Sequence, residues 1–300
     1  QPATSALRCA RQAWKIQYSD SARSLALAEQ ALAKSLARGD VEAEGWARLT
    51  LGHYRLRYAS PAEALAELEA AQRCFGTCGD RRGEIMAQVG QARCQWRQGQ
   101  VLTPLSRVMA VRDEAMQVLN SEERSMMLNV IAGCHSSRGD SPEAFAYLYQ
   151  ALRESHAARG HGFDVVLLCN LAHELLQLGD YYQALKYIDE GIERCRRMSN
   201  KHLHGVLLLN RVLCLTDLDR PGEAMEEVAR LSELLGETAR ADSVETCAVM
   251  ALAALRAGRV DEAAQLCQMA EEAVTEETLA EEALALIVAH AELLRTRGHL

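Results

Sequence analysis

The residues that could carry out catalysis do not form a complete catalytic motif. His173 and Glu174 match the start of a zinc-protease pattern, in which a second histidine lies four residues after the first, but Gln177 stands in its place. Two imidazoles on one helix face are needed to hold the zinc ion in that pattern, so we expect no metal here. The sequence also contains no glycine-rich phosphate-binding loop and no Gly-x-Ser-x-Gly nucleophile turn. We therefore predict no catalytic site, no metal and no cofactor.

The ten cysteines do not indicate a reactive site either. Cys74 and Cys78 lie one helical turn apart, a spacing that suits a shared metal or a strained disulfide, but no second pair accompanies them. Cys134 precedes His135, and consecutive residues on a helix do not face each other, which argues against a nucleophile and its base. Scattered thiols are typical of a reducing compartment, so we expect a cytoplasmic protein.

The charge and the apolar pattern argue against two classes of partner. The chain carries 41 acidic and 33 basic side chains, a net charge of −8, so we expect no nucleic acid. Uninterrupted apolar runs such as Ala283–Ala289 are much shorter than the roughly 20 residues that cross a bilayer, so we expect no membrane segment. Residues 221–300 hold 16 acidic and 6 basic side chains, which predicts a markedly negative end of the molecule.

A spacing of about 40 residues organises the whole chain. Five turn-like segments each lead to an alanine at the start of a helical pattern: Ala64, Ala144, Ala184, Ala224 and Ala263. The missing member of this series falls at Pro104. A second series marks the other turn of each unit: Asp40, Asp80, Asn120, Gly160 and Asn200. Two markers with one period indicate a repeat protein.

Each repeat has the pattern of two antiparallel helices. Apolar residues recur at intervals of three and four, as in the segment 171–192, and the order Ser60 to Glu63 is that of a capping box. Asp40 and Asp80 are the residue type that begins helices as an N-cap. We predict an all-α fold of about seven helix hairpins, with units at approximately 5–39, 40–79, 80–119, 120–159, 160–199, 200–239 and 240–277, and a terminal helix at 279–297.

The clearest unit resembles the tetratricopeptide repeat. The segments Asn170–Ala172, Leu178–Tyr181 and Ala184–Ile188 follow that family's order of Leu with a small residue, a Gly-Asp-Tyr turn, and Ala with a bulky apolar residue four later. The unit exceeds the family's usual 34 residues and is similar to the longer-helix variants of bacterial regulators. The family's tyrosine in the first helix is absent. The resemblance implies one right-handed α-solenoid over residues 1–300, the match itself extending over roughly residues 21–297.

The resemblance also implies where a partner binds. In tetratricopeptide arrays the first helices of the pairs line a concave groove that holds extended peptides. The corresponding residues of this chain are His53, Arg57, Arg93, Trp96, Arg97, Asn129, Asn170, His173, Gln177 and Asn210. Asn170 and Asn210 share one repeat position, and an asparagine amide offers both a donor and an acceptor to a peptide main chain. We therefore expect a protein or an extended peptide as the partner.

Arrays of this style resemble the input regions of bacterial signalling proteins, such as GGDEF-type diguanylate cyclases. We expect a non-catalytic scaffold or regulatory module of a signal-transduction protein, with a catalytic domain following Leu300. The alternative is the sensor array of a transcription regulator, which would bind a small molecule or a signalling peptide in a closed pocket.

The predicted terminal helix carries apolar residues on every face around Ala283–Ala289. Leaving Leu or Ile side chains of this kind in water costs about 1.5–3 kcal/mol each. We therefore expect this helix to be buried on both sides, either by a following segment or by self-association. The residues expected at such a contact are Leu284, Ile287, Val288 and Leu294.

Overall fold

The computed structural model describes residues 4–157, 162–197, 201–236, 243–275, 278 and 280–298, and these form helices and no strands. In chain order the helices are α1 (Ser5–Ile16), α2 (Ser21–Arg38), α3 (Val41–Tyr58), α4 (Pro61–Cys78), α5 (Arg81–Arg97), α6 (Leu102–Val118), α7 (Ser121–Ser136), α8 (Ser141–Ala157), α9 (Phe163–Gln177), α10 (Tyr181–Cys195), α11 (Lys201–Asp217), α12 (Pro221–Gly236), α13 (Val244–Arg256), α14 (Val260–Glu272) and α15 (Ala280–Thr296). The predicted all-α helical repeat fold is confirmed. Two predicted turn markers, Gly160 and Asn200, lie outside the described residues.

Gly-Asp turns separate the first helix pairs. Gly39 ends α2 with a φ of 65°, a left-handed conformation that glycine adopts without strain, and the Asp40 carboxylate accepts from the Ala43 N–H to begin α3. Gly79, with a φ of 76°, and Asp80 repeat this arrangement between α4 and α5. The two predicted aspartate N-caps are confirmed. The 40-residue spacing therefore comes from turns that each supply a helix end and the next helix start.

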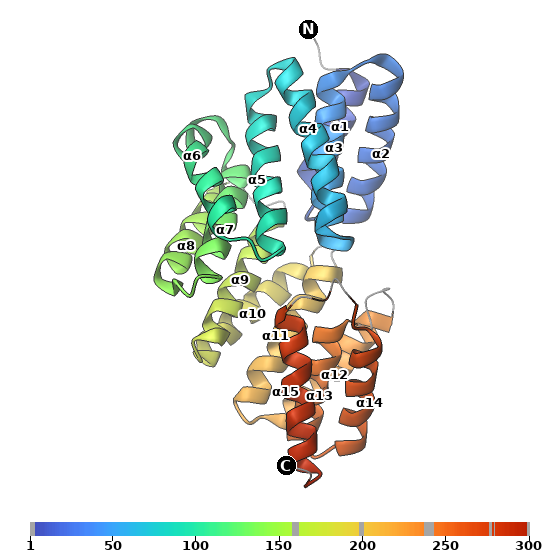
Figure 1. The fold of residues 1–300 in the computed structure, drawn as a ribbon, viewed down its shortest axis with the longest axis vertical. Coiled ribbons are helices and arrows are strands. Elements are labelled where there is room, and N and C mark those ends of the chain that lie inside the picture. The colour runs from blue at the N-terminus through green and yellow to red at the C-terminus, as the bar shows by residue number, and fades with distance from the viewer. Residues whose placement is uncertain are drawn as a thin grey trace. The chain divides into compact units, whose positions relative to one another are not determined.

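The described helices form two compact units, and each is considered by itself. Unit 1 comprises the described residues up to Asn170, and unit 2 comprises those from Leu171 onward. In unit 1, α1, α3, α5 and α7 contact one another in succession and form what we call the first-helix layer, while the helices between them form the second-helix layer (Figure 1). In unit 2, α11, α13 and α15 make the corresponding succession. The division of the chain into a single domain stays a prediction.

Glycines allow the two layers of unit 1 to approach closely. The Phe75 ring of α4 lies between Gly45 of α3 and Gly83 of α5, where an added Cβ atom would come within 2.7 Å and 2.4 Å of it. Leu68, two turns earlier on α4, meets Gly90 in the same way at 2.7 Å. No real Cβ atom fits at such distances, so these positions require glycine for packing rather than for a turn.

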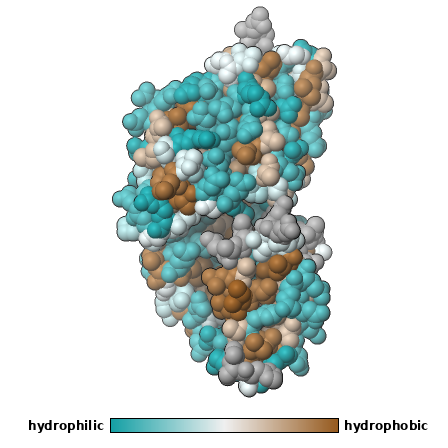
Figure 2. All heavy atoms as spheres, viewed as in Figure 1, coloured by the Kyte–Doolittle hydropathy of each residue, from teal (hydrophilic) through white to brown (hydrophobic). Residues whose placement is uncertain are grey.

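The helix α15 has one covered face and one exposed face. Leu286, Ala289 and Leu293 are buried in the core of unit 2. The apolar residues on its other face are 43–63% exposed: Leu284, Ile287, Val288 and Leu294. The described part of the chain leaves this other face uncovered, since α13 and α14 are the helices that contact α15, and its burial by a following segment or by self-association stays a prediction. Figure 2 shows hydrophobic surface where α15 faces the viewer.

One finding bears on the membrane. Among the described residues, no helix combines the length and the apolar character needed to cross a bilayer. The apolar segment Ala283–Ala289 lies within α15, and α15 carries charged residues at both ends.

Candidate functional site

Tyr18, which follows α1, lies at the centre of several residues that we assigned to a groove. Its side chain is buried, and the Arg57 guanidinium lies 4.6 Å above its ring. Arg57 also donates to the side-chain and main-chain oxygens of Gln17, at 3.3 Å and 3.2 Å. Arg93 donates to the Tyr18 hydroxyl at 3.5 Å, and the Phe163 ring packs against Tyr18 at 4.9 Å. The side chains of unit 1 thus occupy the arginine-lined part of the predicted groove.

His53 is a packed residue of the first-helix layer. Only 1% of it is exposed, and its ring makes an edge contact with Trp14 at 5.0 Å. Neither ring nitrogen has a hydrogen-bond partner among the described residues. Burial, together with the charges of Arg93 and Arg57, holds the pKa of His53 well below its usual value, so the ring is neutral at pH 7. The His53 ring is therefore not accessible to a ligand in this conformation.

The structure brings together two of the predicted asparagines. The Asn170 side-chain nitrogen of α9 donates to the Asn129 side-chain oxygen of α7 at 2.6 Å. Asn129 is buried, whereas Asn170 is half-buried. One N–H and the carbonyl oxygen of the Asn170 amide have no partner among the described residues, so Asn170 retains a donor and an acceptor for a ligand.

Trp96 and Arg97 lie at the end of α5. The Trp96 ring packs on Gly133 of α7, where an added Cβ atom would lie 2.4 Å from it, and its N–H donates to the Ser137 hydroxyl at 2.8 Å. Trp96 is half-buried and Arg97 is exposed. These two residues, with Asn170, are the accessible part of the predicted set in unit 1.

The remaining predicted residues belong to unit 2. His173 and Gln177 lie one turn apart on α9, are exposed, and are hydrogen-bonded to each other at 2.8 Å. Asn210 of α11 is 7% exposed. A peptide main chain has little access to such an amide, although Asn210 was matched to Asn170 by repeat position. The peptide-binding role of the whole set stays a prediction.

The structure also shows a cleft of about 430 Å³ in unit 1 that we did not predict. It lies where α1 passes the N-terminal ends of α3, α5 and α7, and its lining residues are Arg11, Trp14, Lys15, Gln17, Trp46, Arg82, Asn120, Ser121, Glu122, Glu123 and Met126. Charged side chains of both signs therefore share one cleft, beside two indole rings that are 7% and 1% exposed.

Glu123 ties the cleft together. Its carboxylate, 1% exposed, forms two hydrogen bonds of 2.7 Å with the Arg82 guanidinium and accepts from the Trp14 N–H at 2.9 Å. The Arg82 guanidinium also lies 5.0 Å over the Trp46 ring. Because Trp14 is on α1 and Glu123 is on α7, the first-helix layer of unit 1 curves enough to bring its two ends together.

Glu122 is the neighbour of this ion pair and behaves differently. Burial, with the charges of Glu123 and Asp164, raises the pKa of Glu122 to about 7, while Lys15 acts in the opposite direction. Glu122 therefore carries a proton part of the time at neutral pH. This gives the cleft one group that can either donate or accept a hydrogen bond.

A periodic signal could have indicated the cleft from the sequence. Glu42, Arg82 and Glu122 follow one another at intervals of 40 residues, each two positions after a helix-cap residue. Charged residues at a fixed position beside the turn face the same end of the layer. The contribution of α1 was not visible, because Trp14 has no counterpart at this period.

Comparison with known proteins finds similar solved structures but no match by sequence. No known protein-family model and no curated protein matches the chain. NprR in complex with its cognate peptide NprX superposes with a TM-score of 0.66 at 13% identity, over 99% of this chain and 85% of NprR. A Rap protein complexed with Competence and Sporulation Factor superposes with a TM-score of 0.60 at 14% identity, over 97% of this chain and 76% of Rap.

A third similar structure is itself a set of TPR-like repeats. The TPR-like repeats of a putative kinesin light chain from Podosopora anserina superpose with a TM-score of 0.52 at 16% identity, over 64% of this chain and 96% of that one. The fold is that of a tetratricopeptide-like helical repeat. At these identities the likeness establishes the fold alone, and the function has to be argued from the site.

Proposed function

We propose that this chain is a non-catalytic scaffold that binds an extended peptide, or an extended segment of a partner protein, on the first-helix layer of unit 1. The observation that carries the proposal is the cleft of about 430 Å³ at the N-terminal ends of α3, α5 and α7. Trp14 and Trp46 form part of its wall but are only 7% and 1% exposed, and Lys15 offers an exposed cation at its edge. The free half of the Asn170 amide supplies main-chain recognition on the same unit.

The solved structures support this proposal by analogy. NprR is seen with its cognate peptide and Rap with Competence and Sporulation Factor, and both have this chain's fold. Because folds are shared by unrelated functions, the analogy raises the expectation without replacing the site. The accessible subset of the predicted residues, Trp96, Arg97 and Asn170, defines the surface we assign to the peptide.

The tryptophans provide a direct test. The chain has three, at positions 14, 46 and 96, all within unit 1. A peptide library is screened by pull-down, and captured peptides are titrated while intrinsic fluorescence is followed. Lys15→Ala and Asn170→Ala should each weaken binding about tenfold, since each removes a charge or a donor–acceptor pair worth about 1–1.5 kcal/mol.

The control for this titration is Arg73→Ala, which removes an exposed cation from α4 in the second-helix layer. Its affinity should equal that of the unchanged protein. If Arg73→Ala weakens binding as much as Lys15→Ala does, the peptide binds by charge alone and the assigned surface is wrong. If the library yields no peptide, the scaffold function proposed for this layer is wrong.

A second candidate is a sensor for a small molecule or a signalling peptide, as in the regulatory arrays of transcription regulators. The compact volume of the cleft favours it. A metabolite library should then raise the melting temperature of the chain, and Lys15→Ala should reduce that rise. A rise in melting temperature caused only by peptides would leave the first proposal standing and reject the small-molecule form of this candidate.

We also propose that the module regulates a cytoplasmic bacterial signalling protein, with a diguanylate cyclase domain following Leu300. The support is the resemblance of the repeat style to such input regions. In a protein that includes that domain, a peptide bound to unit 1 should change the rate at which GTP is converted to cyclic di-GMP. A following segment without such a domain would overturn this proposal.

The exposed face of α15 supports self-association. Leu284, Ile287 and Val288 place three large apolar side chains, 47–63% exposed, on one helix face. Covering them in a two-fold contact would remove that surface from water. Sedimentation should show a dimer that Ile287→Glu converts to a monomer. A chain that is already monomeric at high concentration would contradict self-association.

A further inference from the structure

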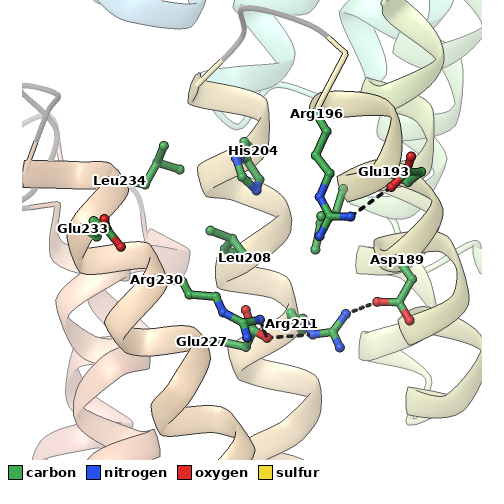
Figure 3. A pocket seen from close by; sticks show the side chains of 11 residues that line it. Asp189, Glu193, Arg196, His204, Leu208, Arg211, Glu227, Arg230, Glu233 and Leu234 are labelled. Atoms are coloured by element: carbon green, nitrogen blue, oxygen red, sulfur yellow. Dashed lines mark hydrogen bonds and ion pairs between the residues drawn. The ribbon is translucent and has the colours of Figure 1, made fainter.

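Unit 2 contains a larger cleft that the proposed peptide surface does not use. It has a volume of about 620 Å³ and lies over α11 between α10 and α12, which both pack on α11 (Figure 3). Its lining residues are Asp189, Ile192, Glu193, Arg196, His204, Leu208, Arg211, Glu227, Arg230, Glu233 and Leu234. The volume is enough for a small organic molecule or one long side chain.

Every guanidinium of this cleft already has a carboxylate. Arg211 reaches Asp189 on one side and Glu227 on the other, where its Nε lies 3.2 Å from Oε1. Arg230 bonds the same Glu227 oxygen at 2.6 Å. Figure 3 shows these pairs along the base of the cleft and the pair between Arg196 and Glu193, at 3.0 Å, near its upper edge. Each positive charge of the cleft is therefore already balanced by a carboxylate.

Two acceptors in the cleft remain without a partner. Glu227 is 4% exposed, and its Oε2 atom has no hydrogen-bond partner among the described residues. A buried carboxylate oxygen in this condition is unfavourable unless a donor reaches it. Glu233, at the exposed edge, has no ion pair with a cation of the described residues. Both acceptors come from α12 and line the same space.

The charge of the cleft also favours a cation. Its lining contains four carboxylates and three guanidinium groups. Burial and the charge of Arg196 lower the pKa of His204, so this ring adds no positive charge at pH 7. The helices that form the cleft, residues 181–236, hold nine acidic and eight basic side chains, so their excess of negative charge is small. The net charge of the cleft lining is negative, which disfavours an anion more than a cation.

We propose that this cleft binds a primary alkylammonium group, whose nitrogen donates to Glu227 Oε2 while its methylene chain lies on Ile192, Leu208 and Leu234. An ammonium nitrogen is compact and carries three donors, which suits one buried oxygen with a second carboxylate, Glu233, nearby at the edge. The three apolar side chains account for the aliphatic part. The group can come from a free diamine or polyamine, or from a lysine side chain of a peptide.

Isothermal titration calorimetry at low ionic strength tests the proposal, with putrescine, spermidine and a short lysine-containing peptide as probes. Saturable binding of one molecule per chain is expected for at least one probe. Whether the amines or the peptide bind more tightly distinguishes the two sources. Magnesium chloride at matched ionic strength should not bind with this stoichiometry. If none of the probes binds at millimolar concentration, or if inorganic phosphate binds instead, the proposal is wrong.

Glu227→Gln has a matched control in its neighbour, since Glu226 is an exposed carboxylate on the same helix. Glu227→Gln should weaken binding at least tenfold, and Glu226→Gln should leave it unchanged. Equal losses would show general attraction to an acidic surface and would overturn the proposal. Because Glu227 is buried, far-ultraviolet circular dichroism checks the fold of the variant. Glu233→Gln, at the exposed edge, gives a second test and should weaken binding about threefold.

The outcome is separable from that of the proposed peptide function. The three tryptophans lie in unit 1, so binding in this cleft of unit 2 should leave their fluorescence unchanged while releasing heat. Lys15→Ala, which tests the surface of unit 1, should not affect the amine. An amine affinity that depends on Lys15 and not on Glu227 would place the amine at the other cleft and overturn the inference.

Discussion

At the scale of single residues, a buried ion pair joins two helices of unit 1. The buried Glu123 carboxylate is held by Arg82 and by the Trp14 indole, which joins α1 to α7. Breaking one side of a buried ion pair leaves an uncompensated charge, and its cost is larger than the net contribution of the pair. Adjacent Arg81 makes its pairs, with Glu84 and Glu114, at the surface.

Arg82→Ala and Arg81→Ala therefore form a matched comparison. We expect Arg82→Ala to lower the free energy of unfolding by about 3 kcal/mol, because Glu123 stays buried without its cation. Arg81→Ala should lower it by less than about 1 kcal/mol, since exposed pairs contribute little. Urea denaturation of the two variants measures both values. Equal losses would mean that burial does not govern the Glu123 pair.

Glu122 makes the stability of unit 1 depend on pH. Its pKa is raised from 4.5 to about 7 in the folded protein. A carboxyl with a raised pKa favours folding at low pH, and this contribution is lost as the pH rises from about 4.5 through 7, because the unfolded chain gives up the proton first. We expect Glu122→Gln to remove the loss, which is on the order of 2 kcal/mol after allowance for solvent screening.

Urea denaturation at pH 5 and at pH 8 measures this difference. The variant should gain stability over the unchanged protein between these two values, with little difference at pH 5. Glu143→Gln removes an exposed carboxylate on α8 and serves as the control. A pH profile that is the same with and without Glu122 would show that the group is not buried in solution.

At the scale of elements, α4 is held between α3 and α5 by glycines that receive its side chains. Gly83 meets the Phe75 ring, whereas Gly76 of α4 has nothing within 4 Å of an added Cβ atom. The same substitution should thus have opposite effects at the two positions. Gly83→Ala should destabilise by about 1–3 kcal/mol through overpacking. Gly76→Ala should stabilise by about 0.5–1 kcal/mol, because glycine is unfavourable within a helix.

Thermal denaturation of these two glycine variants measures the effects. A loss at both positions would contradict the structural assignment of Gly76 to an open helix face. At the same scale, α15 is apolar on both faces, but only one face packs into the core of unit 2. The other face is exposed and is the surface that we propose for self-association.

At the scale of the whole molecule, the described residues divide into two units, and each contains its own core. Helical repeats interact mainly with their neighbours, so parts of one array can unfold separately. Tryptophan fluorescence reports on unit 1 alone, whereas circular dichroism reports on both. We expect the two unfolding curves not to coincide.

Variants in each unit test the separation. Gly83→Ala in unit 1 should shift the fluorescence transition. Gly191→Ala should leave it in place and shift part of the dichroism curve, since its added Cβ would lie 2.8 Å from Leu207 within unit 2. Coincident curves that move together in both variants would show that the two units unfold as one.

The sequence by itself determined the helices and the 40-residue period, because both depend on local features: apolar spacing within a helix and cap residues such as Asp40 and Asp80 at each turn. It indicated which helices share a layer, but not how sharply the layer of unit 1 curves. That curvature depends on how side chains of neighbouring helices fit together, which no single helix contains.

Only the tertiary structure decided which groove residues a ligand can reach. His53 and Arg57 were selected by their register on α3, but the closeness of Trp14 and Tyr18 buries them. The two clefts have the same origin, since each collects side chains from three or more helices. Burial depends on every element that surrounds a residue, whereas the sequence period describes only its own helix.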